Sequence, residues 1–185
     1  MPTRFEPAVL ETGRLRLRWI AEADAPAFFE VYGDPEVARF LSFTAFQDLA
    51  RAQKMVANAQ AGYADGSAVN FAIERREDGK VLGNCMLFRF HDESRRAEIG
   101  YSLGRAHWSQ GYMREALEAL IDYAFGTLNL NRLEADIDPR NPSSAKILER
   151  LGFVKEGVLR ERWVVGGETS DTAYYGLLRR EWNPR

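Results

Sequence analysis

Cysteine and histidine are scarce in this 185-residue sequence, which contains one Cys and two His. The single thiol, Cys85, cannot form a disulfide within the chain, and a lone cysteine is typical of a reducing compartment. Because Cys85 lies in an apolar run without a histidine nearby in sequence, we interpret it as a core residue and not as a nucleophile. These few residues form no recognisable cluster of metal ligands, so we expect no metal site.

The sequence also lacks an excess of positive charge and long apolar runs. Its formal net charge is −2, which disfavours general binding to nucleic acid or to an anionic membrane surface. No apolar run has the length of a membrane span, and the segment Met1–Pro7 lacks the apolar core of a signal peptide. We therefore expect a cytoplasmic protein without a membrane or nucleic-acid partner. The 45% content of hydrophobic residues predicts one domain, residues 1–185, with a sizeable core.

Hydrophobic periodicity predicts a mixed α+β fold. Seven stretches have the apolar pattern of strands: residues 14–20, 68–75, 81–90, 97–103, 132–138, 154–165 and 168–178. Helical spacing covers residues 21–33, 34–41, 46–63, 113–125 and 142–151. This order predicts a mostly antiparallel central sheet of about seven strands flanked by helices. Strands that pair directly early in the chain are joined by helices later, and ligands commonly bind where a sheet changes its connections in this way.

The turn at Gln110-Gly111 is the most informative local feature. It separates the strand-like residues 99–103 from the helical pattern that begins at Met113. The free N–H groups of a first helical turn converge on one point and the helix dipole favours negative charge there, so such a turn suits a phosphate group. Most strand-to-helix turns with one glycine bind nothing, however. This one also lacks the Lys-Ser/Thr of a nucleotide P-loop and the further glycines of a dinucleotide motif.

Five segments in the right order resemble the GNAT acetyltransferases, and within them the RimJ/RimL-like branch of ribosomal-protein alanine and serine N-acetyltransferases. They are similar to the family's first strand, first helical wall, acetyl-CoA motif, second cofactor motif and closing strand: Leu10–Arg18, Asp34–Leu41, Ala97–Ala116, Asn141–Gly157 and Asp171–Trp182. The resemblance covers nearly the whole chain and implies the GNAT fold. Trp108 and Met113 depart from the Arg or Gln and the Gly or Ala of the superfamily's broad pattern. Cofactor binding must then rest on main-chain groups.

The resemblance implies that the acetyl group of acetyl-CoA is transferred to a primary amine by direct attack in a ternary complex. The N–H donors for the pyrophosphate are expected from Ser109, Gln110, Gly111, Tyr112, Met113 and Arg114. A backbone N–H of the strand at Tyr101, Ser102 and Leu103 is expected to stabilise charge on the thioester oxygen. Asn141 is the expected cap of its helix, and its contact with the cofactor is implied only by the family.

Two residues are candidates for the chemistry. Ser144 is the expected hydrogen-bond donor to the leaving sulfur, because this branch often uses the matching position; the alternative is a solvated serine beside the helix cap. Glu98 is the expected base, acting through a water, although a surface glutamate is the more common outcome, and Asp136 and Asp138 are rivals. An α-amine has a pKa of about 7.7–8.0, against about 10.4 for lysine, so an α-amine acceptor would need little base catalysis.

The sequence leaves the acceptor open. Our first hypothesis is the N-terminal α-amine of a protein or peptide. The alternatives are a small-molecule amine, such as a polyamine, amino acid or antibiotic, and a non-catalytic acyl-CoA-binding module. Acceptor contacts are expected from residues 28–63 and from the final hairpin, which carry no decisive charge pattern. Trp163, Tyr174 and Tyr175 could line an acceptor cleft, pack within the sheet or form a dimer surface, so a monomer and a homodimer are both open.

Overall fold

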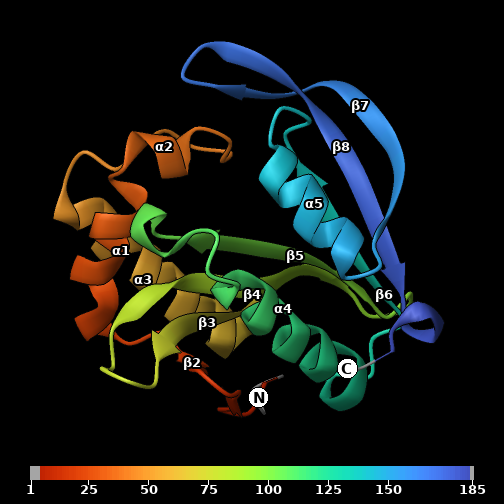
Figure 1. Cartoon of the computed structure of the whole chain (residues 1–185), viewed down its shortest axis with the longest axis horizontal. Helices are drawn as coiled ribbons and strands as arrows, with labels where there is room; N and C mark the ends of the chain where they lie inside the picture. The colour runs from red at the N-terminus through yellow and green to blue at the C-terminus, as the bar shows by residue number, and fades with distance from the viewer. Residues whose placement is uncertain (1–4, 184–185) are drawn as a thin grey trace.

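The computed structural model describes residues 5–183, so the first four residues of the N-terminal segment Met1–Pro7 lie outside the described residues. Figure 1 shows a twisted sheet with helices packed against its faces. The sheet has eight strands in the order β1-β2-β3-β4-β5-β6-β8-β7. The strands are β1 (Val9–Glu11), β2 (Leu15–Trp19), β3 (Ala68–Arg75), β4 (Val81–His91), β5 (Arg96–Leu103), β6 (Arg132–Ile137), β7 (Val154–Val165) and β8 (Glu168–Leu178).

All neighbouring strands pair antiparallel except β5 and β6, which run parallel. The predicted mixed, mostly antiparallel α+β sheet flanked by helices is therefore confirmed. The expected number of strands was one too low, because β1 was missed. This strand has three residues, with Leu10 opposite Leu17 of β2, and so short a segment cannot display an alternating pattern.

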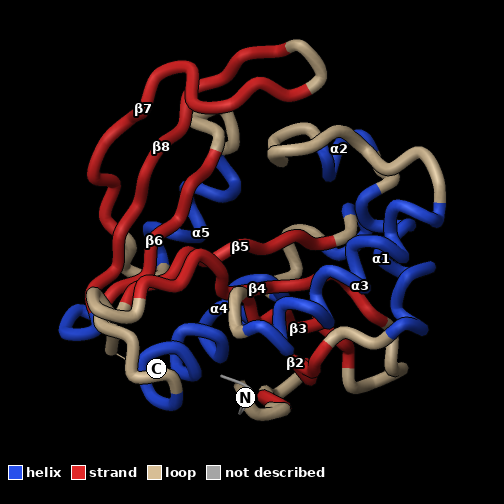
Figure 2. Tube along the Cα trace, turned by 180° about the vertical axis from the view of Figure 1, so that it is seen from behind, coloured by secondary structure: helices blue, strands red, loops and turns tan. Residues whose placement is uncertain are grey.

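The helices lie on both faces of the sheet (Figures 1 and 2). They are α1 (Ala25–Tyr32), α2 (Pro35–Ala38), α3 (Leu49–Asp65), α4 (Tyr112–Asp122) and α5 (Pro142–Arg150). Helix α4 packs on β2, β4 and β5, whereas α1 packs on β4 and α3 on β3 from the opposite face. Cys85 lies fully buried in the core between these layers, which confirms its predicted place, and burial raises the pKa of its thiol.

Local signals explain most element boundaries. Helix α3 begins after Asp48, whose carboxylate accepts a hydrogen bond from the Arg51 N–H at 2.9 Å, and it ends at Gly66, which has a φ of 74°. The helix predicted over residues 21–33 is divided into a short 3₁₀ turn, Glu22–Asp24, and α1. The hairpin predicted at Gly166-Gly167 is confirmed, with both glycines at positive φ.

The parallel pair β5–β6 diverges along its length. Its pairing ends at Glu98 and Glu134, although β5 continues to Leu103 beside β4 and β6 continues to Ile137 beside β8. Figures 1 and 2 show β6 and the β7–β8 hairpin turning away from β5. The facing edges beyond the last paired residues have no partner strand within residues 5–183. The predicted midway change in connection therefore produces a wedge-shaped opening in the sheet.

Candidate active site

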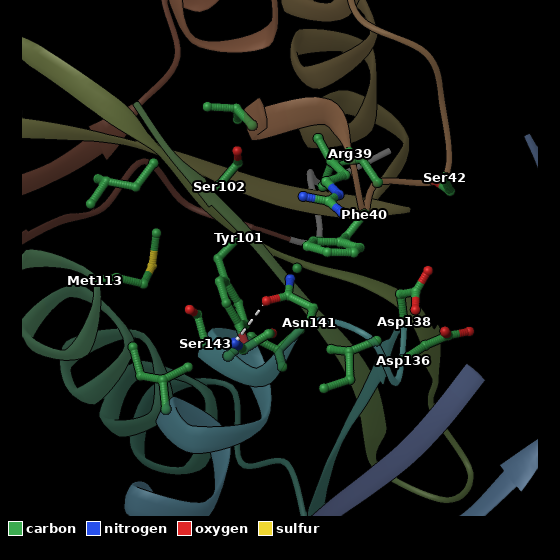
Figure 3. Close-up of a pocket in the computed structure, with 18 of the residues that line it drawn as sticks. Arg39, Phe40, Ser42, Tyr101, Ser102, Met113, Asp136, Asp138, Asn141 and Ser143 are labelled. Carbon is green, nitrogen blue, oxygen red and sulfur yellow. Dashed lines mark hydrogen bonds between the residues drawn. The ribbon is translucent and has the colours of Figure 1, made fainter. Parts of the chain in front are cut away.

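A cleft with a volume of about 1280 Å³ passes through the opening between β5 and β6. A typical pocket for one small ligand measures about 300–1,000 Å³, so this cleft has room for two ligands side by side. Its walls come from the segment after α1, from β4, β5 and β6, from the first turns of α4 and α5, and from the β7–β8 hairpin. Figure 3 shows side chains from these elements converging on one space.

The register of the strands divides the cleft into two faces. Alternate residues of a strand point to opposite faces, so Glu98 and Ser102 of β5 lie opposite Tyr101. Because Glu98 pairs with Glu134, the residue Asp136 shares the face of Glu98. Tyr101 contacts α5, which places α4 and α5 on the second face. One side of the opening is therefore bounded by two helix starts, and the other by carboxylates and the segment after α1.

The predicted phosphate turn has the geometry that an anion requires. Gly111 stands at the start of α4 with a φ of 81°, and Ser109 has a φ of 60°. No side chain of the described residues caps α4, and its first intrahelical bond is from the Glu115 N–H to the Gly111 carbonyl at 3.1 Å. The N–H groups of the three residues between them are therefore available to a ligand.

Five of the six residues predicted to surround the pyrophosphate line the cleft: Ser109, Gly111, Tyr112, Met113 and Arg114. Gln110 does not line it. Its carbonyl accepts a hydrogen bond from Arg14 Nη1 at 3.0 Å, and its side-chain amide donates to the Ala106 carbonyl at 2.9 Å.

Arg14 and Glu115 connect this turn to strand β2. Arg14 Nε donates to Glu115 Oε2 at 2.7 Å, and the Thr12 hydroxyl donates to Glu115 Oε1 at 2.6 Å. Burial acts to raise the pKa of the Glu115 carboxyl, but the hydrogen bonds from Thr12 and Arg14 outweigh it and lower this pKa. Sequence analysis missed this connection, because alternating arginines at positions 14, 16 and 18 are typical of a solvated strand face and give no signal of a distant partner.

The start of α5 places Ser144 beside Tyr101. Asn141 is the helix cap, as predicted, and its Oδ1 accepts a hydrogen bond from the Ser144 N–H at 3.1 Å. Ser144 is only 8% exposed, and its Oγ lies 2.6 Å from the Tyr101 hydroxyl. The alternative of a merely solvated serine is therefore wrong. Asn141, Tyr101 and Ser144 all line the cleft, together with Ser102 and Leu103.

Glu98 is buried, with 5% of its surface exposed, so the alternative of a surface glutamate is wrong. Its Oε2 accepts a hydrogen bond from Arg89 Nη1 at 2.9 Å, and the Tyr174 hydroxyl donates to its Oε1 at 3.4 Å. Burial and the charge of Glu98 raise the pKa of Tyr174 to about 12, which keeps this phenol protonated. Glu98 therefore lines the cleft while its carboxylate is paired with the Arg89 guanidinium.

The rival carboxylates, Asp136 and Asp138, also line the cleft and lie close together in Figure 3. Asp138 Oδ2 accepts from Arg140 Nη2 at 2.7 Å, and this bond lowers the pKa of the carboxyl. Asp136 Oδ1 accepts hydrogen bonds from the Thr172 hydroxyl and the Trp163 indole N–H. Its Oδ2 is closed to solvent and has no hydrogen-bond partner within residues 5–183.

Apolar side chains complete the face of the cleft that carries Glu98 and Asp136. Trp163 lines it, whereas Tyr175 is only 3% exposed and belongs to the packed sheet. Met86 and Phe88 of β4 lie over Gly100, where an added Cβ would approach Met86 Cε to 2.8 Å. Sequence analysis missed these two β4 residues, because their run is continuously apolar and shows no alternation between core and cleft. Phe40 and Phe43, after α2, form the remaining wall.

Within residues 5–183, no group of three His, Cys, Asp or Glu side chains is arranged to hold a metal ion. In the same range, no helix has both the length and the apolar character needed to cross a membrane.

Comparison with known proteins identifies the family. Residues 14–154 match the model of the acetyltransferase (GNAT) domain. The chain is 40% identical over 173 residues to a protein of Bacillus licheniformis named uncharacterized N-acetyltransferase p20, covering 94% of this chain and 97% of that one. It is 32% identical over 124 residues to the [ribosomal protein uS5]-alanine N-acetyltransferase of Escherichia coli, covering 64% of this chain and 62% of that one.

A solved structure has the same fold. The spermidine N-acetyltransferase of Vibrio cholerae, in complex with CoA and spermine, superposes with a TM-score of 0.81 at 20% identity, covering 92% of this chain and 98% of that one. The match to the GNAT model spans most of the sequence, and the B. licheniformis protein is similar over nearly its whole length. The chain therefore belongs to the GNAT family of acetyltransferases and is an N-acetyltransferase.

Proposed function

We propose that this enzyme transfers the acetyl group of acetyl-CoA to the N-terminal α-amine of a protein or peptide, by direct attack in a ternary complex. The observation that carries the proposal is that one continuous cleft passes through the β5–β6 opening, with helix starts on one face and the carboxylates of Glu98 and Asp136 on the other. We assign the carboxylate side as the acceptor chamber. Two substrates in one cleft can react with each other directly, so no acyl-enzyme is needed. Cys85 agrees with this, because it is fully buried.

Acetyl-CoA fits the helix-start face. The uncapped N–H groups of Tyr112, Met113 and Arg114 suit its pyrophosphate, and positive φ angles at Ser109 and Gly111 keep the turn open for close approach. The cofactor supplies an activated acetyl group as a thioester. Around residues 101–103, β5 still pairs with β4 but no longer with β6, and a backbone N–H on this open edge would stabilise the negative charge that develops on the thioester oxygen. Asn141 contributes by fixing the first turn of α5.

Ser144 would donate a hydrogen bond to the departing sulfur. It is buried, lines the cleft and stands on the same face as the phosphate turn. A hydrogen bond to a charged acceptor is worth about 1.5–3 kcal/mol, and here it would form fully only as the thiolate develops. Removal of the hydroxyl should therefore lower kcat more than it changes the KM for acetyl-CoA.

Two observations support a peptide N-terminus as the acceptor: the β7–β8 hairpin covers the cleft as a roof, and one relative is named for a protein substrate. The tip of the β7–β8 hairpin lies against the segment after α2, where an added Cβ on Gly166 would be 3.3 Å from Thr44 Cγ2. A chain end can enter beneath such a roof more easily than a loop can. The E. coli relative is named as an alanine N-acetyltransferase of ribosomal protein uS5, and an acceptor of this kind would place the reaction in the cytoplasm.

We assign Glu98 as the base that accepts the proton of the amine through a water. Its carboxylate lines the cleft and is paired with Arg89, whose Nη1 lies 2.9 Å from Glu98 Oε2. An ion-paired carboxylate is a weak base, but an α-amine with a pKa of about 7.7–8.0 demands little of it. The role of Glu98 should therefore matter most below that pH range.

The test is a coupled thiol-release assay with acetyl-CoA and a panel of amines. The panel contains peptides that begin with Ala, Ser or Thr, the same peptides with a blocked N-terminus, free lysine, spermidine and an aminoglycoside. We expect turnover of the free peptides alone, and a loss of about tenfold or more in kcat for Ser144→Ala. Turnover of only the small amines would refute the peptide acceptor and would make the enzyme a small-molecule acetyltransferase.

A further inference from the structure

Tyr101 and Ser144 form a hydrogen-bonded pair across the boundary between β5 and α5. Their oxygens are 2.6 Å apart, although the two residues are 43 positions apart in sequence. Neither hydroxyl makes another hydrogen bond within residues 5–183. Each oxygen carries one proton, so only one of the two protons lies between them. The other proton is free to point into the cleft.

The chemistry of the two hydroxyls decides which proton is free. A phenol is far more acidic than an aliphatic alcohol, so Tyr101 is the better donor and Ser144 the better acceptor. Burial raises the pKa of Tyr101, so the phenol keeps its proton at neutral pH and remains a donor. The Ser144 backbone is fixed by its bond to Asn141, which leaves its Oγ–H directed by the tyrosine. The free proton is then on Ser144.

We propose that Tyr101 is a positioning residue, which orients and strengthens the Ser144 hydroxyl as the hydrogen-bond donor to the leaving sulfur. The inference rests on the role of Ser144 in the proposed function. As the amine nitrogen bonds to the acetyl carbon, the C–S bond breaks and its electron pair stays on sulfur. The nitrogen loses one proton to solvent through Glu98, and the thiolate, held by Ser144, takes one from water. Hydrogen bonds in series polarise one another, so the phenol makes Ser144 a stronger donor.

The experiment compares the wild-type enzyme with Tyr101→Phe, Ser144→Ala and the double variant. Tyr175→Phe is the matched control, because it also removes a buried phenol hydroxyl but lies outside the cleft. The first readout is kcat with the best amine of the panel, together with the KM for acetyl-CoA. The second is the pKa of the CoA thiol in the binary complex, followed by the ultraviolet absorbance of the thiolate. This readout needs no acceptor.

We expect kcat to fall about tenfold or more in Ser144→Ala and about three- to tenfold in Tyr101→Phe. The double variant should be no slower than Ser144→Ala, because Tyr101 acts through Ser144. Both single variants should raise the pKa of the bound thiol, whereas Tyr175→Phe should change neither readout by more than about twofold. The KM for acetyl-CoA should stay close to the wild-type value throughout.

The possible outcomes distinguish the role of Tyr101 from the role of Ser144. Multiplying losses in the double variant, or equal behaviour of Tyr101→Phe and Tyr175→Phe, would overturn the role of Tyr101 alone. An unchanged kcat and an unchanged thiol pKa in Ser144→Ala would refute the role of Ser144 and, with it, this inference. If the wild-type enzyme acetylates no amine in the panel, the acceptor assignment fails, and the thiol pKa of the variants still decides the role of Tyr101.

Discussion

Arg14 contacts the phosphate turn, and replacing it should affect acetyl-CoA binding more than the stability of the fold. Arg14→Ala removes the hydrogen bond to the Gln110 carbonyl and the ion pair with Glu115. The Arg14 side chain is 49% exposed and that of Glu115 20%, and exposed ion pairs contribute only about 0–1 kcal/mol. The free energy of unfolding should therefore fall by less than about 1 kcal/mol.

The effect on the turn should be larger than the effect on the fold. Ser109 is a non-glycine residue at positive φ, a conformation that costs about 1–3 kcal/mol and needs support from its surroundings. If Arg14 supplies about 1 kcal/mol of that support, its loss should weaken acetyl-CoA binding by about fivefold. We expect a correspondingly higher KM for acetyl-CoA, with kcat nearly unchanged, because the reacting atoms are held elsewhere.

Steady-state kinetics and calorimetric binding of CoA measure this directly. Arg16→Ala is the matched control, since Arg16 lies two residues further along, in β2, and pairs with Glu11 and Glu74 on the side away from the turn. The same KM in both variants would refute the reasoning. A fall in kcat of Arg14→Ala with an unchanged KM for acetyl-CoA would also refute it, because Arg14 would then affect the chemical step and not cofactor binding.

Three further predictions concern the acceptor face and the direct-attack mechanism. Glu98→Gln should lower kcat/KM for an Ala-peptide by about tenfold at pH 7, and the loss should shrink above pH about 8, where the α-amine is already neutral; a loss independent of pH in a rate profile would exclude the base role. Gly100→Ala should raise the KM of the amine but not that of acetyl-CoA, because the new methyl pushes the flexible Met86 side chain into the acceptor chamber; equal changes in both KM values would contradict this. Cys85→Ala should keep kcat within about twofold while costing about 1 kcal/mol of stability in chemical denaturation; loss of activity from a folded variant would revive a covalent intermediate.

Local sequence signals predicted the parts of the site that depend on neighbours in the chain. The glycine turn before α4, the Asn141 cap and the glycine hairpin each need only a few adjacent residues, and each was found where expected. In each case the residue type indicates the backbone conformation: glycine suits positive φ, and a short polar side chain suits a helix start.

Contacts between distant segments could not be predicted in this way. The Tyr101–Ser144 pair depends on where β5 separates from β6, which no local pattern records. Glu98 is buried and paired with Arg89, and nothing in the sequence around either residue indicates this contact. Gln110 shows the converse case, because it lies in the predicted turn but its carbonyl is engaged by Arg14. Side-chain partners across the sheet become visible only when strand register is known.

The position of the transferred acetyl group tests the central claim most directly. The measurement uses an unblocked peptide that carries both an N-terminal alanine and an internal lysine, incubated with enzyme and acetyl-CoA and sequenced by tandem mass spectrometry. The roofed cleft and the direct-attack mechanism predict acetylation of the α-nitrogen, with the lysine unmodified. Acetylation of the lysine, or no modification under conditions where spermidine is consumed, would contradict the proposed function.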